Sequence, residues 1–292
     1  MFYPKLSDVR DVWIRNDSYS VASFPLNGVT SLNFDNSTPR REVNILGQPT
    51  SNIIMDGPFN YGVSLSRNLF GPDLFWGWTG VNQLRFQIAF DTDRTGGGAI
   101  NPYKTYGMVS LQGGYMDSYS VDVSAGGIPQ IQSSFRFDNG TGFYDMLTGW
   151  RSALGDATDS TPQYIPQTGI VLNLGGIDSG QVVTSANFAA KFNWVKEPVM
   201  VKDLNDTTNR GNYFISSLVR PIQYSASIQM TIDDYEVGEF AFRNPQTWEL
   251  SVTCETGLIA TYTMPNAELV DESVNITAGQ PSTVSLGYIG VG

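Results

Sequence analysis

The chain has 292 residues, of which only 15% are charged, and its formal net charge is -11. A strongly acidic chain is a poor general binder of nucleic acid, because such binding depends on Lys and Arg side chains that neutralise phosphates. The sequence contains no histidine, which removes the usual base of a catalytic triad and a common zinc ligand. We therefore expect no enzyme, and no catalytic, metal or cofactor site.

The first clear element is a strand at residues 61–65. Tyr61, Val63 and Leu65 lie on alternate positions, which is the period of a strand with one buried face. The same alternation follows at residues 84–91 and 120–123. Thirty Gly and 15 Pro between such short runs are typical of an all-β protein with many turns.

An aromatic segment lies between the first two of these strands, at residues 68–78. It contains too many aromatic side chains for an ordinary exposed loop. Either it folds back onto its own domain, or it fills a pocket on a neighbouring subunit, where aromatic anchors dominate binding energy. The candidate inter-subunit contacts in this segment are Phe70, Leu74, Phe75, Trp76 and Trp78.

One short helix is predicted to flank the strands. Phe143, Met146, Leu147, Trp150 and Leu154 form a single apolar stripe at helical spacing, which would pack on a sheet. The length of the chain suits two domains, and we place their boundary here, with domain 1 at residues 1–140 and domain 2 at residues 141–292.

A second long segment covers residues 196–220. It is longer than a tight hairpin needs, so it is either an arm that reaches a partner or an ordinary mobile loop. The candidate inter-subunit contacts in this segment are Val199, Met200, Asn205 and Arg210.

Three strand patterns recur in the same order later in the chain. Tyr61 matches Tyr224 at an offset of 163 residues, Leu84 matches Trp248 at an offset of 164, and Ser120 matches Ser273 at an offset of 153. Three ordered matches predict a tandem pair of related β-domains. The smaller third offset indicates a longer hairpin loop in the first copy, around residues 96–98.

The remaining motifs are more typical of structural positions than of functional sites. Cys254 is the only cysteine and lies on an apolar strand face, so it is a buried hydrophobe rather than a nucleophile. The acids at residues 233–239 are typical of a solvated loop. Residues 91–96 begin like a calcium loop, but Pro102 stands where the last ligand should be. The N-terminus has no secretory pattern and no apolar run is long enough to span a membrane, so we expect a cytoplasmic origin.

Several segments resemble the tail tube (major tail) proteins of tailed bacteriophages. The C-terminal residues 263–269, 273–276 and 279–288 resemble the closing strands of that family. Residues 117–137, and more distantly residues 17–34, resemble the same element.

This resemblance implies a β-sandwich or barrel with a flanking helix that assembles into stacked rings around a channel. Two tube-like domains in one chain would let three copies close a ring that otherwise takes six. The implied partners are further copies of the chain, other tail proteins such as the tail tip, terminator, tape measure or sheath, and double-stranded DNA that passes without sequence-specific binding. The implied location is the virion tail, assembled in the host cytoplasm, with no membrane partner.

Acidic side chains in such a channel would repel the phosphates of passing DNA. The candidate channel-lining acids, all on polar strand faces, are Asp91, Asp122, Glu249 and Glu255.

Other functions stay open. The same fold could serve as a tail-tip, hub or adaptor protein. A receptor-binding domain that binds glycans would stack sugars on tryptophans, for which the candidates are Trp76, Trp78, Trp150, Trp194 and Trp248. An outer-membrane barrel is disfavoured by the acidic composition and the lack of a secretory pattern.

Overall fold

The described part of the protein, seen in a computed structural model, is almost entirely β-strand, and its strand pairs are antiparallel. This confirms the predicted all-β fold class. The structure describes residues 9–16, 24–25, 28–37, 40–43, 53–56, 60–69, 73, 75–76, 84–91, 106–146, 169–174, 177–178, 182–198, 214–232, 246–254, 257–277 and 282–292.

The strands fall into two consecutive sets. The first set is β1 (Val9–Asn16), β2 (Phe24–Pro25), β3 (Val29–Ser37), β6 (Asn60–Asn68), β7 (Leu84–Asp91), β8 (Tyr106–Ser124) and β9 (Gln130–Met146), with a separate hairpin of β4 (Arg40–Val43) and β5 (Ile53–Asp56). The second set is β10 (Gly169–Leu174), β11 (Ile177–Asp178), β12 (Val182–Pro198), β13 (Phe214–Ile232), β14 (Gln246–Cys254), β15 (Gly257–Asn275) and β16 (Ser282–Val291).

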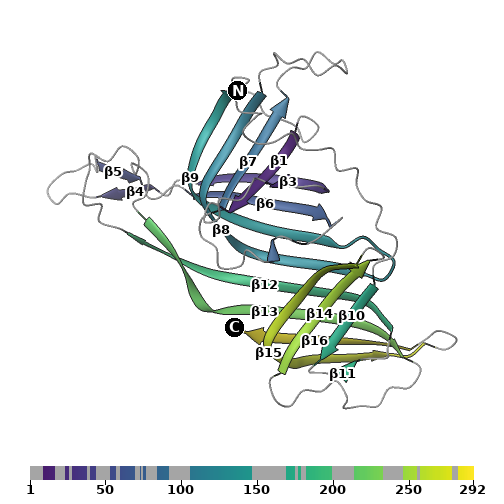
Figure 1. Ribbon diagram of the computed structural model, residues 1–292. Coiled ribbons are helices and arrows are strands. Elements are labelled where there is room, and N and C mark those ends of the chain that lie inside the picture. Colours follow the sequence, from purple (N-terminus) through teal and green to yellow (C-terminus); the bar gives the residue numbers. More distant parts are fainter. Residues whose placement is uncertain are drawn as a thin grey trace, which may run out of the picture.

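A continuous ladder of strands, here called the central ladder, crosses both sets in the order β3-β6-β9-β8-β12-β13-β16-β15 (Figure 1). The long strands β8 and β15 extend beyond this ladder. The end of β8 that lies outside it pairs with β7, and the corresponding end of β15 pairs with β14. The two flanking groups, β7-β1-β2 and β14-β10-β11, continue from there.

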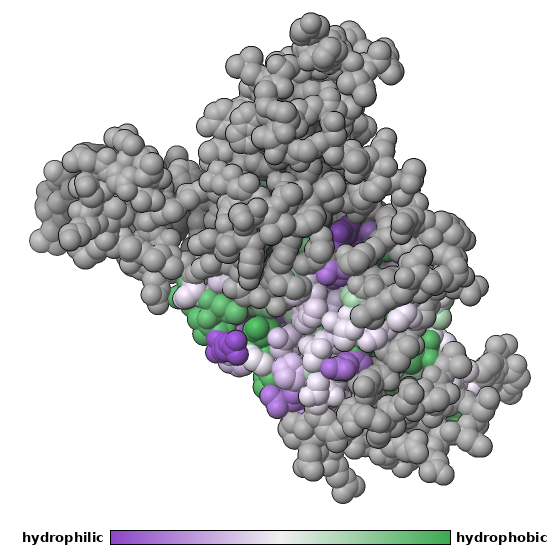
Figure 2. All heavy atoms as spheres, in the orientation of Figure 1, coloured by the Kyte–Doolittle hydropathy of each residue, from purple (hydrophilic) through white to green (hydrophobic). Residues whose placement is uncertain are grey.

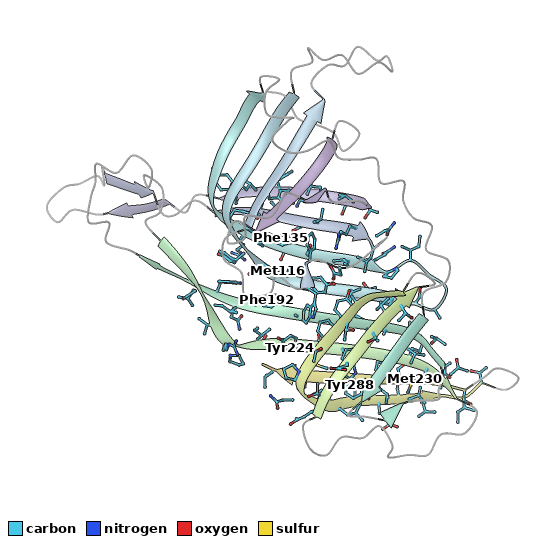
Figure 3. The ribbon with its side chains drawn as sticks, in the orientation of Figure 1. Met116, Phe135, Phe192, Tyr224, Met230 and Tyr288 are labelled. Atoms are coloured by element: carbon cyan, nitrogen blue, oxygen red, sulfur yellow. The ribbon has the colours of Figure 1, made fainter. Side chains whose placement is uncertain are left out.

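The apolar face of the central ladder packs against the flanking groups. Phe188 of β12 stacks on Trp248 of β14 with ring centroids 5.7 Å apart, and Phe34 of β3 meets Phe86 of β7 edge-on at 6.4 Å. The buried apolar side chains of both sets form one continuous core, to which the labelled Phe135, Phe192 and Tyr288 belong (Figure 3). Alternation along each strand therefore produces a single shared core.

The two sets have the same strand order. The first runs β3-β6-β9-β8-β7-β1-β2 and the second runs β12-β13-β16-β15-β14-β10-β11. We call them the first half and the second half. Each connection of the first half therefore recurs in the second.

Backbone irregularities recur as well. The bulge at Thr30 in β3 matches the bulge at Thr184 in β12. The Thr30 hydroxyl donates to the Ser66 carbonyl at 3.1 Å, and the Thr184 hydroxyl donates to the Gln229 carbonyl at 3.0 Å. A bulge is a specific local feature, so these matches align the two halves residue by residue.

This alignment changes one of the sequence matches. Phe86 pairs with Leu111 beside a bulge, and Trp248 pairs with Met264 beside the equivalent bulge. The counterpart of Trp248 is therefore Phe86, not Leu84 as the sequence match had it. An alternating pattern fits equally well after a shift of two residues, so it identifies the face of a strand without fixing its register.

The prediction of a helix is wrong for its first residues, which form part of a strand. Strand β9 continues through Met146, and Tyr144 and Met146 pair with Met108 and Tyr106 of β8. The extended β8 offers backbone partners along this whole stretch, and these satisfy the backbone in place of a helical turn. Residues 147–154, with the rest of the predicted stripe, lie outside the described residues. The division near residue 140 stays a prediction, although that residue itself lies within β9.

The segment at residues 196–220 begins and ends as strand. Glu197 in β12 pairs with Ile215 in β13, so the described parts form an extended hairpin. Val199, Met200, Asn205 and Arg210 lie outside the described residues. Figure 2 shows apolar side chains at the surface beside this hairpin, where Val195 and Val219 are exposed.

Candidate assembly interface

The two halves meet along a seam between β8 and β12. Residues 118–124 pair with residues 185–191. On the core side Phe188 lies opposite Val121, and both are fully buried. On the other side the Asn187 amide donates to the Asp122 carboxylate at 2.5 Å. The seam thus combines an apolar face with a polar one, as any interior strand pair of the central ladder does.

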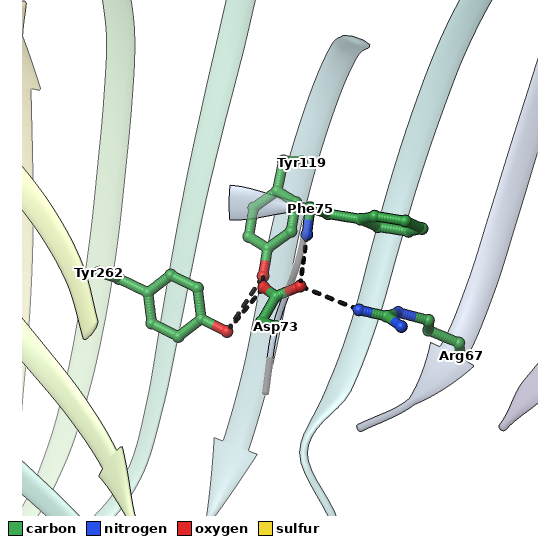
Figure 4. Close-up of polar contacts among 5 residues, drawn as sticks. All are labelled: Arg67, Asp73, Phe75, Tyr119 and Tyr262. Carbon is green, nitrogen blue, oxygen red and sulfur yellow. Dashed lines mark hydrogen bonds and ion pairs between the residues drawn. The ribbon is translucent and has the colours of Figure 1, made fainter. Parts of the chain in front are cut away.

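A buried polar cluster lies behind this seam (Figure 4). Asp73 accepts an ion-paired hydrogen bond from Arg67 at 2.9 Å and a backbone N–H bond from Phe75 at 3.0 Å. Its other carboxylate oxygen accepts from the hydroxyls of Tyr119 and, at 3.1 Å, Tyr262. Because Tyr119 belongs to the first half and Tyr262 to the second, this Asp73 cluster ties the halves together.

Burial determines the protonation of the two phenols. Desolvation, reinforced by the neighbouring phenol and the Asp73 carboxylate, raises the pKa of Tyr119 well above its ordinary value. Desolvation, followed by the Asp73 charge, likewise raises the pKa of Tyr262. Both phenols therefore stay protonated and act as donors to Asp73. The Asp73 side chain is fully buried and that of Arg67 nearly so, an arrangement suited to holding the halves in place.

The described residues of the aromatic segment fold back into their own chain. Phe75 is fully buried, with its ring edge-on to Phe135 at 5.5 Å and beneath the Arg67 guanidinium at 4.2 Å. Trp76 packs against Phe188 at 5.0 Å, among other rings. Of the two interpretations of this segment, the structure thus favours packing within the chain for Phe75 and Trp76. Phe70, Leu74 and Trp78 lie outside the described residues.

The tryptophans whose side chains the structure describes are Trp76, Trp194 and Trp248, and each contacts other groups of its own chain. Trp248 is fully buried, and the Trp194 indole donates to the Met116 carbonyl at 2.7 Å while its ring lies on Tyr115. These side chains serve internal packing.

The central ladder has two outer edges. Among the described strands, β3 pairs with β6 alone, and residues 271–275 of β15 pair with β16 alone. Three large apolar side chains at these edges face solvent: Phe34 is 39% exposed, Val274 48% and Ile276 78%. Their exposure is unusual for core-face positions of a sheet, and exposed apolar edge strands invite pairing with another chain.

The face of the central ladder opposite the core is polar and hollowed by a groove. Hydroxyl and amide side chains from several strands line it, among them Asn33, Ser64, Ser120, Gln132 and Ser225. The charged side chains along its described lining are Lys191 and Glu268.

The four predicted channel-lining acids do not all lie on this face. Asp122 does, next to Asn187 of the seam. Glu249 lies on β14 in a flanking group, where it pairs with Asn173 and Thr263. Asp91 ends β7, and its side chain is outside the described set, as is all of Glu255. The structure thus places one of the four acids on the polar face of the central ladder.

No family model and no curated protein matches the chain. The described residues contain no group of three or more His, Cys, Asp or Glu that could hold a metal ion. Within the same residues, no helix has the length and hydropathy needed to cross a membrane.

Sequence reasoning missed two features of the interface. Residues 29–34 and 183–188 share the pattern Val-Thr-Ser-x-Asn-Phe, a repeat that a direct comparison of the halves would have found. The pairing of Arg67 with Asp73 carries no comparable signal, because neither residue belongs to a repeated pattern.

Proposed function

We propose that this chain is a structural subunit that assembles with copies of itself into rings, and that stacked rings form the tail tube of a bacteriophage. The observation that carries the proposal is the seam between β8 and β12. Two halves with the same strand order are joined there edge to edge into one ladder. A chain built in this way already contains two neighbouring positions of a repeating assembly, and a repeating head-to-tail contact generates a ring when its rotation closes.

In this proposal each half is one tube domain. Three copies would then supply the six positions that the resemblance to tail tube proteins implies. Because two neighbouring ring positions belong to one chain, every second contact around the ring is intramolecular. This lowers the entropic cost of assembly. The Asp73 cluster supports this arrangement because it holds the two halves in a fixed relation.

The polar groove face would line the channel. Hydroxyl and amide side chains make up most of its polar lining, in which the positive charge of Lys191 is matched by the negative charge of Glu268. Asp122, elsewhere on the same face, adds a charge that repels DNA phosphates. Contacts with other tail proteins, such as the tail tip, terminator, tape measure or sheath, would involve the ends of the ring.

Negative-stain electron microscopy of the purified chain across a range of concentrations tests the proposal, combined with mass measurement of the smallest species. Rings or hollow tubes are expected, with a mass of three chains per ring. A monomer at every concentration would contradict the proposal and favour a tail-tip, hub, adaptor or receptor-binding role, for which a glycan array is the next experiment.

A further inference from the structure

We propose that β3 of one chain pairs antiparallel with residues 271–277 of the next chain, which are the end of β15 and the two residues after it, in the register that sets Asn33 opposite Asn275. This inference rests on the proposed self-assembly and adds the strands, the register and the residues of the contact. The partner is a second copy of this chain.

The register follows from the alignment of the two halves. Strand β3 pairs with β6 as β12 pairs with β13, and the bulge shared by Thr30 and Thr184 makes Phe34 the counterpart of Phe188. Strand β8 bulges between Met116 and Ser118, and β15 bulges at the equivalent place between Leu269 and Asp271. Val274 is therefore the counterpart of Val121.

The seam supplies a template for the contact. Within one chain, β12 pairs with β8 so that Ala186 faces Val123, Asn187 faces Asp122 and Phe188 faces Val121. Replacing each residue by its counterpart gives the pairs expected between chains. These are Leu32 with Ile276, Asn33 with Asn275, and Phe34 with Val274.

Residue chemistry at the two edges fits this pairing. The apolar pairs would fall on the core side of the ladder, as they do at the seam. Val121 and Phe188 of the seam are fully buried, whereas their counterparts Val274 and Phe34 are 48% and 39% exposed. Pairing the edges would remove this apolar surface from water. On the polar side, Asn33 and Asn275 can exchange amide hydrogen bonds, in place of the bond between Asn187 and Asp122.

A second copy is the partner that the ladder itself specifies. β3 and β15 lie at opposite ends of the central ladder, visible as separate edges in Figure 1, so they cannot pair within one chain. An open edge accepts many strands in principle. Only a strand with the pattern of β8 reproduces the seam. Among the described strands, β15 has that pattern, and its residues 271–275 pair with β16 alone.

The contact between chains differs from the seam in its charges. Asp35 and Asp271 stand at the positions that Ala189 and Ser118 occupy at the seam. In the proposed register these two carboxylates are diagonal neighbours on the polar face, where like charges oppose pairing. The contact between chains is therefore weaker than the seam and is strengthened by salt.

Disulfide cross-linking tests the register. In a Cys254→Ala background, which removes the only native thiol, the pair Asn33→Cys and Asn275→Cys is expected to form disulfides between chains under mild oxidation, because directly opposed positions lie within disulfide reach. Asn33→Cys combined with Ser273→Cys or Thr277→Cys provides controls shifted by two residues, which lie beyond that reach. Asn187→Cys with Asp122→Cys, at the seam, should form a disulfide within one chain at any concentration.

Non-reducing electrophoresis and electron microscopy of the same samples separate the outcomes. The inference is supported if the 33/275 pair gives ladders of linked chains and its rate of cross-linking is at least tenfold higher than that of the shifted pairs. Faster linking by a shifted pair, or rings without links between chains, would overturn the register or the edge contact while leaving the proposed function intact. A monomer with neither rings nor links would overturn both.

Discussion

The seam inside the chain and the two free edges have the same strand pattern but opposite environments. Phe188 at the seam is fully buried, and its counterpart Phe34 at the edge is 39% exposed. Val123 is 3% exposed, and its counterpart Ile276 is 78% exposed. The same type of side chain is thus core in one place and surface in the other, because among the described strands only the seam has a strand beside it. An interface between chains can therefore be recognised in a single chain when an equivalent pair of strands is already joined within that chain.

The largest expected effect concerns the polar cluster behind the seam, which the free edge lacks, since the counterpart of Tyr119 there is Glu272. Asp73→Ala leaves the buried Arg67 without its ion pair, and we expect a loss of about 3–5 kcal/mol in the free energy of unfolding. Urea denaturation measures it. Asp271→Ala, an exposed acid at the edge, is the control and should change stability by less than about 0.5 kcal/mol. Equal effects of the two variants would contradict the assigned role of the cluster.

A matched pair of truncations compares the seam and the edge directly. Phe188→Ala empties a buried site and should cost about 3–5 kcal/mol of stability. Phe34→Ala should cost less than half of that in the monomer, because its ring is partly in water already. Assembly should nevertheless weaken in Phe34→Ala when followed by sedimentation velocity. If both variants lose the same monomer stability, Phe34 belongs to the core of its own chain and not to a contact.

Alkaline pH tests the buried phenols of the Asp73 cluster, which lies behind the seam and has no counterpart at the edge. The pKa values of Tyr119 and Tyr262 are raised in the folded state by burial. Above about pH 10 the unfolded chain therefore releases these protons first, and the free energy of unfolding should fall by about 1.4 kcal/mol per pH unit for each phenol. Below that pH the contribution is complete. Tyr119→Phe should have a shallower decline in denaturation experiments between pH 10 and 11, and an unchanged slope would argue against its burial.

A charge at the free edge should block assembly without unfolding the chain. Ile276→Lys places an ammonium group at a position that is 78% exposed in the monomer and buried in the proposed contact. We expect monomer stability within about 0.5 kcal/mol of the original, and assembly weakened at least tenfold by analytical ultracentrifugation. Ile128→Lys is the control, because Ile128 is also exposed but lies between β8 and β9, outside the two segments that would pair. Normal ring formation by Ile276→Lys would exclude this edge.

The smallest expected effect is a gain. Asp35→Ala combined with Asp271→Ser copies the seam residues Ala189 and Ser118 into the edge. Removing one like-charge pair is worth about 0.2–1 kcal/mol, so the concentration needed for assembly should fall by roughly 1.4- to fivefold. Added salt should help the original chain more than this variant. Glu268→Ser, which removes an acid outside the register, should leave the threshold unchanged.

Part of the candidate interface was available from the sequence. Alternation at residues 61–65, 120–123 and 273–276 identified strands and their repetition, because the side-chain period of a strand depends only on its own backbone. The same local information misled at Phe143 and Met146, whose spacing also suits a helix, and it misplaced the counterpart of Trp248 by two residues.

The sequence by itself determined that the chain is all-β, that its strand patterns are duplicated and which face of each strand is apolar. The tertiary structure alone decided which apolar faces become core. Phe75 entered the core of its own chain and Trp76 packed against that core, whereas Phe34 and Ile276 stayed at an edge. Burial depends on which strand lies alongside, and that neighbour is chosen by contacts between residues far apart in the chain, such as those that bring Asp73 to Tyr262.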